Sequence, residues 1–475
     1  MKQLLLSVRP EETRLAVSED GVLTDYLTER PDQEDLVGRV YKGIVKNVVP
    51  AVKGMFLDLG IGRNAFLRNE DCPAGQGRLP TEGASLLVQV VKDSTPTKGP
   101  LVTGRISLAG RCSVLLTDST YVGVSRKIRS EEKRAALRRA AKDCCPEGLG
   151  LIVRTAADAA SKEEAVQDIR RLASLWEVIQ RRARIAKGPA LLYRGIGLTV
   201  RTVRDFLTDD VDAVITDEEE TARQLVRIME EEGIVGTERV RRETGPIFRN
   251  HHVDEQIRQL FQREVLLPSG GSLVIDYTEA LTAVDVNSGS FHRKGISHSE
   301  AAFLVNREAA AEIARQVRLR GIGGIILIDF IDMEEKEQQQ AVLEVLRKAA
   351  ARDRVKTVVV GMTALGLVEM TRKRTAHRLF QNYYEPCSTC GGTGYVLSPA
   401  SVVLRIHHAL EEKKAQGGIP YPLVIECHPD AADILETEKE QWYLKSMMLR
   451  PVRVERRPDF RRETFSILAD PHGGR

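Results

Sequence analysis

Two aspartates, Asp285 and Asp329, each stand where an apolar, strand-like run ends. The two runs are LTAVDVNSGS (281–290) and GGIILIDFIDM (323–333), and a helix-patterned stretch, about 297–320, lies between them. A strand, a crossover helix and a second parallel strand place the two strand ends side by side. Two carboxylates brought together there repel unless a cation lies between them. Oxygen ligands without a nearby Cys or His favour a hard ion such as Mg²⁺.

Asn287 lies two residues after Asp285, and side chains alternate along a strand, so both point to one face. Asn287 can therefore hold the carboxylate in place. Asp332 is a third ligand candidate if the strand has already turned after Asp329. Either aspartate alone could instead cap a turn or form a salt bridge. A bound Mg²⁺ polarises a phosphoryl oxygen and offsets the charge of an in-line displacement, which is chemistry suited to phosphodiesters.

A second group of residues could contact nucleic acid. Phe56 and Phe66 lie in neighbouring strand-like runs, and Lys98 lies in the loop TPTKGP nearby. Small barrels often stack bases on exposed aromatic rings, and a lysine could meet the adjoining phosphate. The alternative is that both rings belong to the barrel core.

The segment CSTCGGTG places Cys387 and Cys390 at the spacing of a zinc knuckle. Zinc takes four ligands, and this motif supplies two. Cys427 and His428 could complete the site, or two chains could each donate a cysteine pair. A redox motif is the competing interpretation, although the thioredoxin-like context is missing.

The segment LIVRTA places the guanidinium of Arg154 beside the hydroxyl of Thr155, a combination that can clamp a phosphate. An ordinary surface strand would look the same. The sequence has no P-loop, no GxSxG and no HExxH motif.

The composition is that of a globular protein of several domains, with 475 residues, 42% of them hydrophobic and 29% charged. The net charge is only +3, but the stretch 126–142 holds eight Lys or Arg against two Glu. Several such clusters make a phosphate backbone a reasonable partner. Seven scattered cysteines and no signal peptide or membrane-spanning run indicate a reducing, cytoplasmic compartment.

These residues need a framework, and the pattern predicts one. Short strands fill residues 1–37, and five strand-like runs over 38–108, the last being PLVTGRISL, predict a small barrel of the OB type. Mostly helical pattern follows from residue 130, and 268–289 reads as a hairpin. A helix over about 335–352 and the strand TVVVGM follow the second aspartate.

In this order the motifs resemble the ribonuclease E/G family of bacterial endoribonucleases. The resemblance is carried by YKGIVKNVVP, RISLAG, GLIVRTA, FQREVLLPSGGSLVIDYTEALTAVDVNSG, EIARQVRLRGIGGIILIDFIDM and CSTCGGTG. Several motifs in order are far more specific than any one of them. The length is similar to that of the compact type in this family, without a long disordered scaffold.

The resemblance implies an α/β multidomain architecture. We expect an RNase H-like subdomain (1–37 with 198–266) that is split by an S1, OB-type β-barrel (38–108) and a 5′-sensor subdomain (109–197). A DNase I-like catalytic subdomain (267–386), a zinc-link (387–396) and a small α/β dimerisation domain (397–475) follow.

The resemblance also implies roles for single residues. Asp285 and Asp329 match magnesium-binding aspartates, Asn287 their supporting residue, and Cys387 and Cys390 a zinc-link shared by two chains. The implied RNA-binding residues of the S1 domain are Phe56, Phe66 and Lys98. The implied 5′-monophosphate pocket holds Arg154, Thr155, Gly110, Val114, Arg126 and Lys356, the last standing where an Arg is expected and lacking its bidentate fork.

The implied reaction is Mg²⁺-dependent hydrolysis of single-stranded, often AU-rich RNA to 5′-phosphate and 3′-hydroxyl ends, in rRNA processing and mRNA decay. The implied assembly is a zinc-linked homodimer, with a homotetramer left open. Two other functions remain alternatives: a non-catalytic, S1-type RNA-binding protein and a DNA nuclease. A pure binder would not need the set of Asp285, Asn287 and Asp329.

Overall fold

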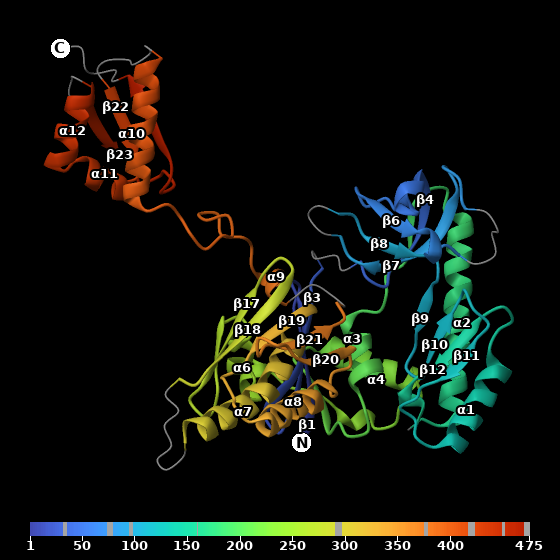
Figure 1. The fold of residues 1–475 in the computed structure, drawn as a ribbon. Coiled ribbons are helices and arrows are strands. Elements are labelled where there is room, and N and C mark those ends of the chain that lie inside the picture. Colours follow the sequence, from blue (N-terminus) through green and yellow to red (C-terminus); the bar gives the residue numbers. More distant parts are fainter. Residues whose placement is uncertain are drawn as a thin grey trace. The chain divides into compact units, whose positions relative to one another are not determined.

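A computed structural model describes residues 1–31, 36–73, 79–94, 98–158, 160–289, 297–374, 379–416, 423–448 and 452–469. Its contacts divide the chain into two compact units, Met1–Asn382 and Tyr383–Arg475 (Figure 1). Within the ranges described, none of the helices has the length and apolar character that crossing a membrane requires.

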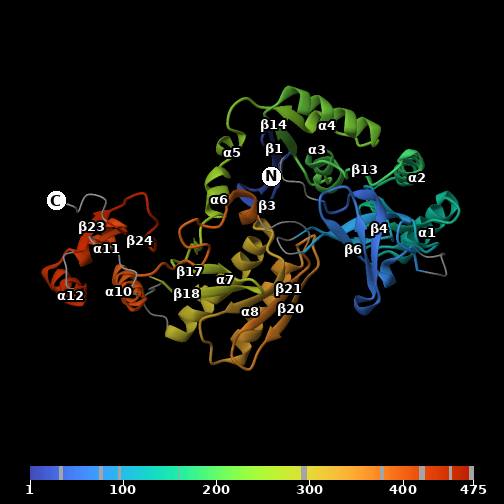
Figure 2. The same ribbon diagram turned by 90° about the horizontal axis from the view of Figure 1, so that it is seen from above.

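The first sheet of the large unit joins strands from two distant parts of the chain, in the order β15-β14-β1-β2-β3. Strand β1 runs parallel to β14 and antiparallel to β2, and β14 lies beside β1 in Figure 2. Leu4 and Leu6 pack against Leu225 and Met229 of helix α4. The elements are β1 (Lys2–Val8), β2 (Thr13–Glu19), β3 (Val22–Glu29), α3 (Leu198–Arg201), the π-helical η4 (Thr202–Phe206), β14 (Ala213–Thr216), α4 (Glu219–Glu231), η5 (Thr237–Arg239), β15 (Val240–Arg242), α5 (Ile247–Asn250) and α6 (Asp254–Gln259).

Five strands close into a small barrel, which confirms the OB-type expectation. The ring runs β4-β5-β6-β8-β7, and β7 pairs again with β4. Its interior is filled by alternate residues such as Met55, Leu57, Ala65 and Leu67. The elements are β4 (Val40–Val49), η1 (Pro50–Val52), β5 (Gly54–Asp58), β6 (Asn64–Arg68), η2 (Asn69–Asp71), β7 (Ser85–Lys92) and β8 (Leu101–Thr103).

Two details of the barrel differ from the expectation. The run 100–108 is not one strand, because the chain turns at Gly104, where an added Cβ would lie 2.4 Å from the ring of Pro73. Strand β9 (Ser107–Ala109) therefore belongs to the next sheet. In addition, β13 (Ala190–Tyr193) returns from far along the chain and pairs with β4 outside the ring.

A four-stranded sheet, ordered β11-β12-β10-β9, packs against helices α1 and α2. Leu115 and Leu151 of the sheet meet Ile169 and Trp176 of α2 in one core. Helix α2 begins at a complete capping box formed by Ser161 and its partner three residues on. The remaining elements are β10 (Ser113–Leu116), β11 (Val122–Val124), α1 (Glu131–Cys144), β12 (Gly150–Val153), η3 (Thr155–Asp158) and α2 (Lys162–Ile185).

The last sheet of the large unit has six strands in the order β16-β17-β18-β19-β21-β20. The expected hairpin is present as β17 and β18, and β18 runs parallel to β19, as the crossover pattern predicts. The elements are β16 (Glu264–Leu266), β17 (Ser272–Tyr277), β18 (Leu281–Asn287), α7 (His298–Leu319), β19 (Gly324–Asp329), α8 (Lys336–Ala350), β20 (Thr357–Met362), β21 (Val368–Arg372) and α9 (Leu379–Tyr383).

Helix α7 is the crossover between β18 and β19. The Ser297 side chain caps it by accepting from the Glu300 amide at 3.2 Å. Val305 and Ile313 of the helix share a core with Val284 of β18 and other buried residues of the sheet. Helices α7 and α8 therefore bury one face of the sheet, and the opposite face carries exposed side chains.

The second unit has its own core around a three-stranded sheet, ordered β23-β22-β24. Strand β22 is parallel to β23 and antiparallel to β24, and helices α10 and α11 contribute Ile406 and Leu435 to the core. The elements are α10 (Pro399–Ala415), β22 (Leu423–Cys427), α11 (Pro429–Leu435), α12 (Glu438–Met448), β23 (Val452–Arg456) and β24 (Phe465–Ala469).

Candidate functional site

Asp285 and Asp329 are direct neighbours across the parallel pair of β18 and β19, where they are partners in the register. Both are exposed, whereas Val284, Val286 and Ile328 beside them are buried under the helices. Because side chains alternate along each strand, the two carboxylates point to the same open face. The structure thus brings together the two aspartates that the sequence paired.

Asn287 supports this pair directly. Its Nδ2 donates a hydrogen bond to Oδ2 of Asp285 at 2.9 Å. The backbone of Asn287 is in turn packed against Gly271, where an added Cβ would lie 2.8 Å from the Asn287 carbonyl oxygen. A side chain at position 271 would therefore displace the strand end that carries the site.

The turn after Asp329 is fixed by a buried amide that the sequence analysis missed. Asn306 on α7 is fully buried, and its Nδ2 donates to the Ile331 carbonyl at 2.7 Å while its Oδ1 accepts from the Ile331 amide at 3.0 Å. One side chain thus satisfies both backbone groups of Ile331 and determines how the chain leaves β19.

The donor set at this place suits a hard cation, because carboxylate and amide oxygens are the ligands that Mg²⁺ accepts alongside water. The third-ligand role of Asp332 is not supported. Among the described residues, no group of three or more His, Cys, Asp or Glu is placed to hold a metal. Asp332 is exposed and follows the turn that Asn306 holds.

The two phenylalanines of the barrel lie side by side on its outside. Phe56 and Phe66 are partners across β5 and β6, with ring centroids 5.4 Å apart. Both are half-buried, and neither belongs to the cluster of buried residues that fills the barrel, which argues against the core interpretation. Lys98 is exposed in the loop that returns to this place, since the Phe66 amide donates to the Pro100 carbonyl at 2.8 Å.

The four-stranded sheet gathers the residues expected at a 5′-phosphate pocket. Arg154 follows β12, and its Nη1 donates to the Gly110 carbonyl at 2.6 Å. Val114, on the neighbouring β10, is half-buried and pairs with Ala109 on β9. The hydroxyls of Thr155 and Ser125 lie 3.0 Å apart, and Arg126 follows Ser125 on an exposed turn. Five of the six expected residues therefore lie at one end of the strands of this sheet.

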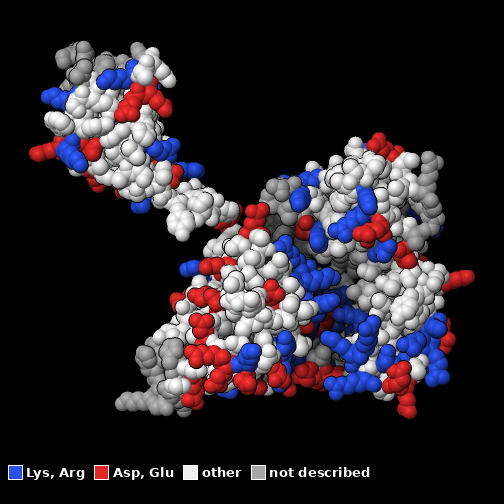
Figure 3. All heavy atoms as spheres, viewed as in Figure 1, with Lys and Arg blue, Asp and Glu red and all other residues white. Residues whose placement is uncertain are grey.

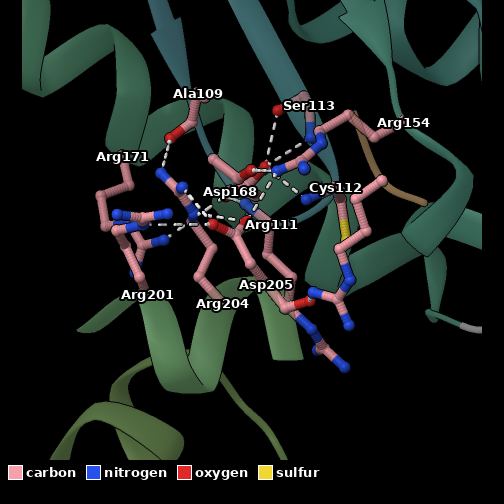
Figure 4. Close-up of polar contacts among 12 residues, drawn as sticks. Ala109, Arg111, Cys112, Ser113, Arg154, Asp168, Arg171, Arg201, Arg204 and Asp205 are labelled. Carbon is pink, nitrogen blue, oxygen red and sulfur yellow. Dashed lines mark hydrogen bonds and ion pairs between the residues drawn. The ribbon is translucent and has the colours of Figure 1, made fainter. Parts of the chain in front are cut away.

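The loop beginning at Gly110 is held by a buried carboxylate. Asp168 of α2 accepts hydrogen bonds from three consecutive amides, those of Arg111, Cys112 and Ser113, at 2.8 to 3.1 Å (Figure 4). A Cβ at Gly110 would lie 2.3 Å from Oδ1 of Asp168, so only glycine fits there. The carboxylate sets the shape of the loop whose carbonyl receives Arg154.

A second carboxylate, Asp205 at the end of η4, gathers several arginines (Figure 4). Arg204 is bidentate to it at 2.9 and 2.5 Å, Nη1 of Arg154 lies 3.3 Å away and Nε of Arg201 4.0 Å away. Burial alone would raise the pKa of Asp205, but the hydrogen bond and charge of Arg204, with the charges of Arg154 and Arg201, hold that pKa below its usual value.

The sixth expected residue, Lys356, is exposed, and its carbonyl accepts from the Lys373 amide at 3.0 Å. It is Arg354, two residues earlier, that reaches the Asp205 cluster: its Nη1 donates to the Asp205 carbonyl, and its guanidinium lies 3.9 Å above the Phe206 ring. Figure 3 shows Lys and Arg side chains gathered in the hollow beside α3 and β20, the elements that flank this cluster.

The cysteine pair lies on an exposed loop of the second unit. Amide hydrogen bonds from Cys390 and Thr389 lower the pKa of the Cys387 thiol to about 7, which favours the thiolate that a metal requires. Cys427 is buried in the core of that unit, where burial raises its pKa to about 11, and His428 caps α11 by accepting from the Asp430 amide. Because no group of three or more His, Cys, Asp or Glu is placed to hold a metal among the described residues, the structure does not support the alternative in which Cys427 and His428 complete the site.

Comparisons with known proteins agree with this geometry. The model of the Ribonuclease E/G family matches residues 107–375, more than half of the chain. The chain belongs to the ribonuclease E/G family. Ribonuclease G of Escherichia coli K12 is 35% identical over 98% of this chain and 99% of its own length. Ribonuclease E of Nostoc is 38% identical over 76% of this chain and 54% of its own length, and Ribonuclease E of Escherichia coli K12 is 36% identical over 87% and 40%.

The sequence analysis missed three residues whose contacts shape the candidate sites, Asn306, Asp205 and Arg354. Asn306 follows the apolar run FLV on the expected helix, and an amide on the apolar side of a helix is a signal that it satisfies backbone groups. Arg354 carries only a weak signal, its place beside Lys356, and Asp205 carries none, because both act through contacts between distant segments.

We expect Asn306→Ala to lower the stability of the catalytic sheet by about 1–3 kcal/mol, because the amide and carbonyl of Ile331 lose their partner. Thermal unfolding should begin at a lower temperature, and the Ile331 amide should exchange its hydrogen faster. Arg307→Ala, on the exposed side of the same helix, is the control. Unchanged exchange at Ile331 would mean that Asn306 does not hold the turn.

Proposed function

We propose that the chain is a Mg²⁺-dependent endoribonuclease that hydrolyses single-stranded, AU-rich RNA and leaves 5′-phosphate and 3′-hydroxyl ends. The enzyme class follows from the family, so the chain is an endoribonuclease and not only an RNA-binding protein. The observation that carries the finer proposal is the register pairing of Asp285 with Asp329 on an open sheet face.

Asp285 and Asp329 would hold the ion, which supplies positive charge to the phosphoryl group in the transition state. Asn287 keeps the Asp285 carboxylate turned outward by its 2.9 Å hydrogen bond. The turn held by Asn306 keeps the end of β19 level with that of β18. Each contact reduces the freedom of the two carboxylates before any substrate arrives.

The barrel rings Phe56 and Phe66 would stack unpaired bases, and Lys98 would meet the backbone between them. Stacking of this kind selects RNA that is already single-stranded, and weakly paired AU-rich segments open most easily. The same argument gives preference for RNA over a DNA duplex, in which the bases stay paired.

The end of the four-stranded sheet around Arg154 would bind the 5′-monophosphate of the RNA. Arg154 would offer a guanidinium, Thr155 a hydroxyl and Arg126 an exposed charge, and Gly110 and Val114 would line the pocket. Binding there would position the chain for cleavage rather than alter the chemistry. Lys356 would add an exposed charge to this pocket, and Arg354, two residues earlier, contacts the Asp205 carbonyl.

Cys387 and Cys390 would provide two of the four ligands of a zinc ion, and a second copy of the chain would provide the others. The exposed loop and the lowered pKa of Cys387 support this arrangement. The assembly would be a homodimer that acts in the cytoplasm in rRNA processing and mRNA decay.

The first test is cleavage of a short, fluorescent, AU-rich single-stranded RNA. Asp285→Asn and Asp329→Asn should each reduce internal cleavage by about 100-fold or more, the effect of losing several kcal/mol of transition-state stabilisation, while RNA binding survives. EDTA should abolish cleavage by the wild type, and Mg²⁺ should restore it.

Asp276→Asn is the matched control, because Asp276 lies on the neighbouring strand β17 and pairs with Arg263 at 2.6 Å instead of facing a second carboxylate. Near-normal cleavage by either test variant would contradict the two-aspartate site. Cleavage of a matched single-stranded DNA at the same rate would contradict the choice of RNA.

A second expectation concerns the barrel. Phe56→Ala and Phe66→Ala should each weaken binding of single-stranded RNA by about 1–3 kcal/mol, which is about 5- to 150-fold in Kd. Fluorescence anisotropy measures this directly. Val91→Ala, an exposed apolar residue on β7, should leave binding unchanged. If all three changes weaken RNA binding equally, the two rings have a purely structural role.

A third expectation concerns the cysteine pair. Cys387→Ser should remove zinc and convert the dimer to a monomer, as measured by native mass spectrometry and elemental analysis. Cys144→Ser, at a half-buried cysteine of the large unit, should change neither. One zinc ion per monomer in the wild type, instead of one per pair, would exclude the shared site.

A further inference from the structure

Asp205 lies beside the proposed 5′-phosphate pocket and forms ion pairs with three arginines, Arg154, Arg201 and Arg204. Its side chain is only 16% exposed, and Arg204, itself 14% exposed, is its closest partner. Arg204 also donates to the Ala109 carbonyl at 2.9 Å, just as Arg154 donates to the Gly110 carbonyl. Through these two arginines the Asp205 carboxylate is therefore connected to the loop at Ala109 and Gly110, which forms part of the proposed pocket.

Arg154 uses one edge of its guanidinium for these contacts. Within the part of the chain that the structure describes, its recorded side-chain hydrogen bonds, to Gly110 and to Asp205, both leave from Nη1. The side chain remains 35% exposed. Nε and Nη2 are thus left to meet a phosphate, as the bidentate geometry of arginine allows.

The backbone of Asp205 makes a different contact. Its carbonyl accepts from Arg354, and the Arg354 guanidinium stacks on the ring of Phe206, the next residue. Arg354 belongs to the short segment between α8 and β20 of the catalytic sheet. Asp205 therefore touches the pocket through its side chain and the catalytic subdomain through its main chain.

The segment that carries Arg354 is anchored to the catalytic sheet by a buried ion pair. Asp353 and Arg372 lie 2.7 Å apart, and both side chains are 5% exposed. Arg372 is the last residue of β21, which pairs with β19, the strand that ends at Asp329. An unbroken series of contacts thus runs from Arg154 to the strand that carries a metal-site aspartate.

We propose that Asp205 is the positioning residue that couples the 5′-phosphate pocket to the catalytic sheet. Its carboxylate holds Arg154 ready for the phosphate, and its carbonyl holds Arg354, so that occupancy of the pocket favours the arrangement of the catalytic subdomain that cleaves. This inference rests on the proposed function of the pocket. The π-helical turn that carries Asp205 is the type of local irregularity found frequently at functional sites.

The sign of the effect follows from the charges. Without the carboxylate, Arg154, Arg201 and Arg204 would face one another unneutralised, and Arg204 would be a buried charge that has lost its partner. The guanidiniums would move apart, and Arg154 would leave the geometry that presents Nε and Nη2. Loss of Asp205 should therefore weaken 5′-end recognition, not strengthen it.

The test compares two RNAs of identical single-stranded sequence, one with a 5′-monophosphate and one with a 5′-hydroxyl. Asp205→Asn, nearly equal in shape, should reduce the ratio of their kcat/KM values by at least about fivefold. Asp217→Asn is the control: Asp217 is a carboxylate only 3% exposed that follows β14 and pairs with Arg9 at 2.9 Å, away from the arginine cluster of Asp205.

Arg354→Ala separates the two ends of the coupling, because it breaks the carbonyl contact and leaves the pocket intact. It should preserve the affinity for a non-cleavable 5′-monophosphorylated RNA and lower the kcat advantage of that end. Such a split of binding from kcat is not what a merely destabilised protein would show. Thermal unfolding of each variant shows whether it is folded. If Asp205→Asn does not fold, Arg354→Ala alone tests the proposal.

Arg154→Ala distinguishes failure of the proposed pocket from failure of the proposed role of Asp205. If Arg154→Ala leaves the ratio unchanged, the proposed pocket itself is wrong. If Arg154→Ala lowers the ratio but Asp205→Asn leaves it unchanged or raises it, the pocket stands and the role of Asp205 is refuted. An equal loss of binding and kcat advantage in Arg354→Ala would refute the coupling.

Discussion

The parallel pairing of β18 with β19 is the constraint on which the proposed site depends. Asp285 and Asp329 are adjacent only because Val284 and Val286 of one strand and Ile328 of the other are buried on the same side. A shift of one residue would turn Asp329 toward the helices and expose its apolar neighbours. The free energy that holds two like charges together therefore comes from apolar burial under α7 and α8, and the site itself contributes none of it.

The carboxylates at the candidate sites are of two kinds. Asp168, Asp205 and Asp353 are buried and satisfied by amides or guanidiniums, and they organise loops. Asp285 and Asp329 are exposed, and among the described residues no arginine or lysine forms an ion pair with them. A carboxylate that is to bind a metal ion must not already be neutralised by an arginine or lysine of the protein. Asp285 and Asp329 meet that condition.

The sequence was sufficient for the features that depend on local pattern. The apolar runs that end at the two aspartates and the helical period between them define a strand, helix and strand, and the handedness rule for such units does the rest. The outward position of Phe56 and Phe66 could not be decided that way, because alternation alone does not say which side of a barrel strand is inside. The split of 100–108 at Gly104 depends on Pro73, some thirty residues earlier along the chain. Asp205 and Arg354 could not be paired at all, since their contact joins the π-turn of one subdomain to a loop of another.

The first sheet has a consequence for how the chain is made. The parallel neighbour of β1 is β14, which begins at Ala213. The sheet is therefore incomplete until β14 has been synthesised. The barrel and the four-stranded sheet lie wholly between these two strands, and their cores need no residue from either one. During translation they can fold while β1, β2 and β3 form an incomplete sheet in which the β1 edge that later pairs with β14 is still unpaired. Closing so long a loop costs little more than closing a short one once its contents are compact, which allows an inserted domain to sit inside a continuous sheet.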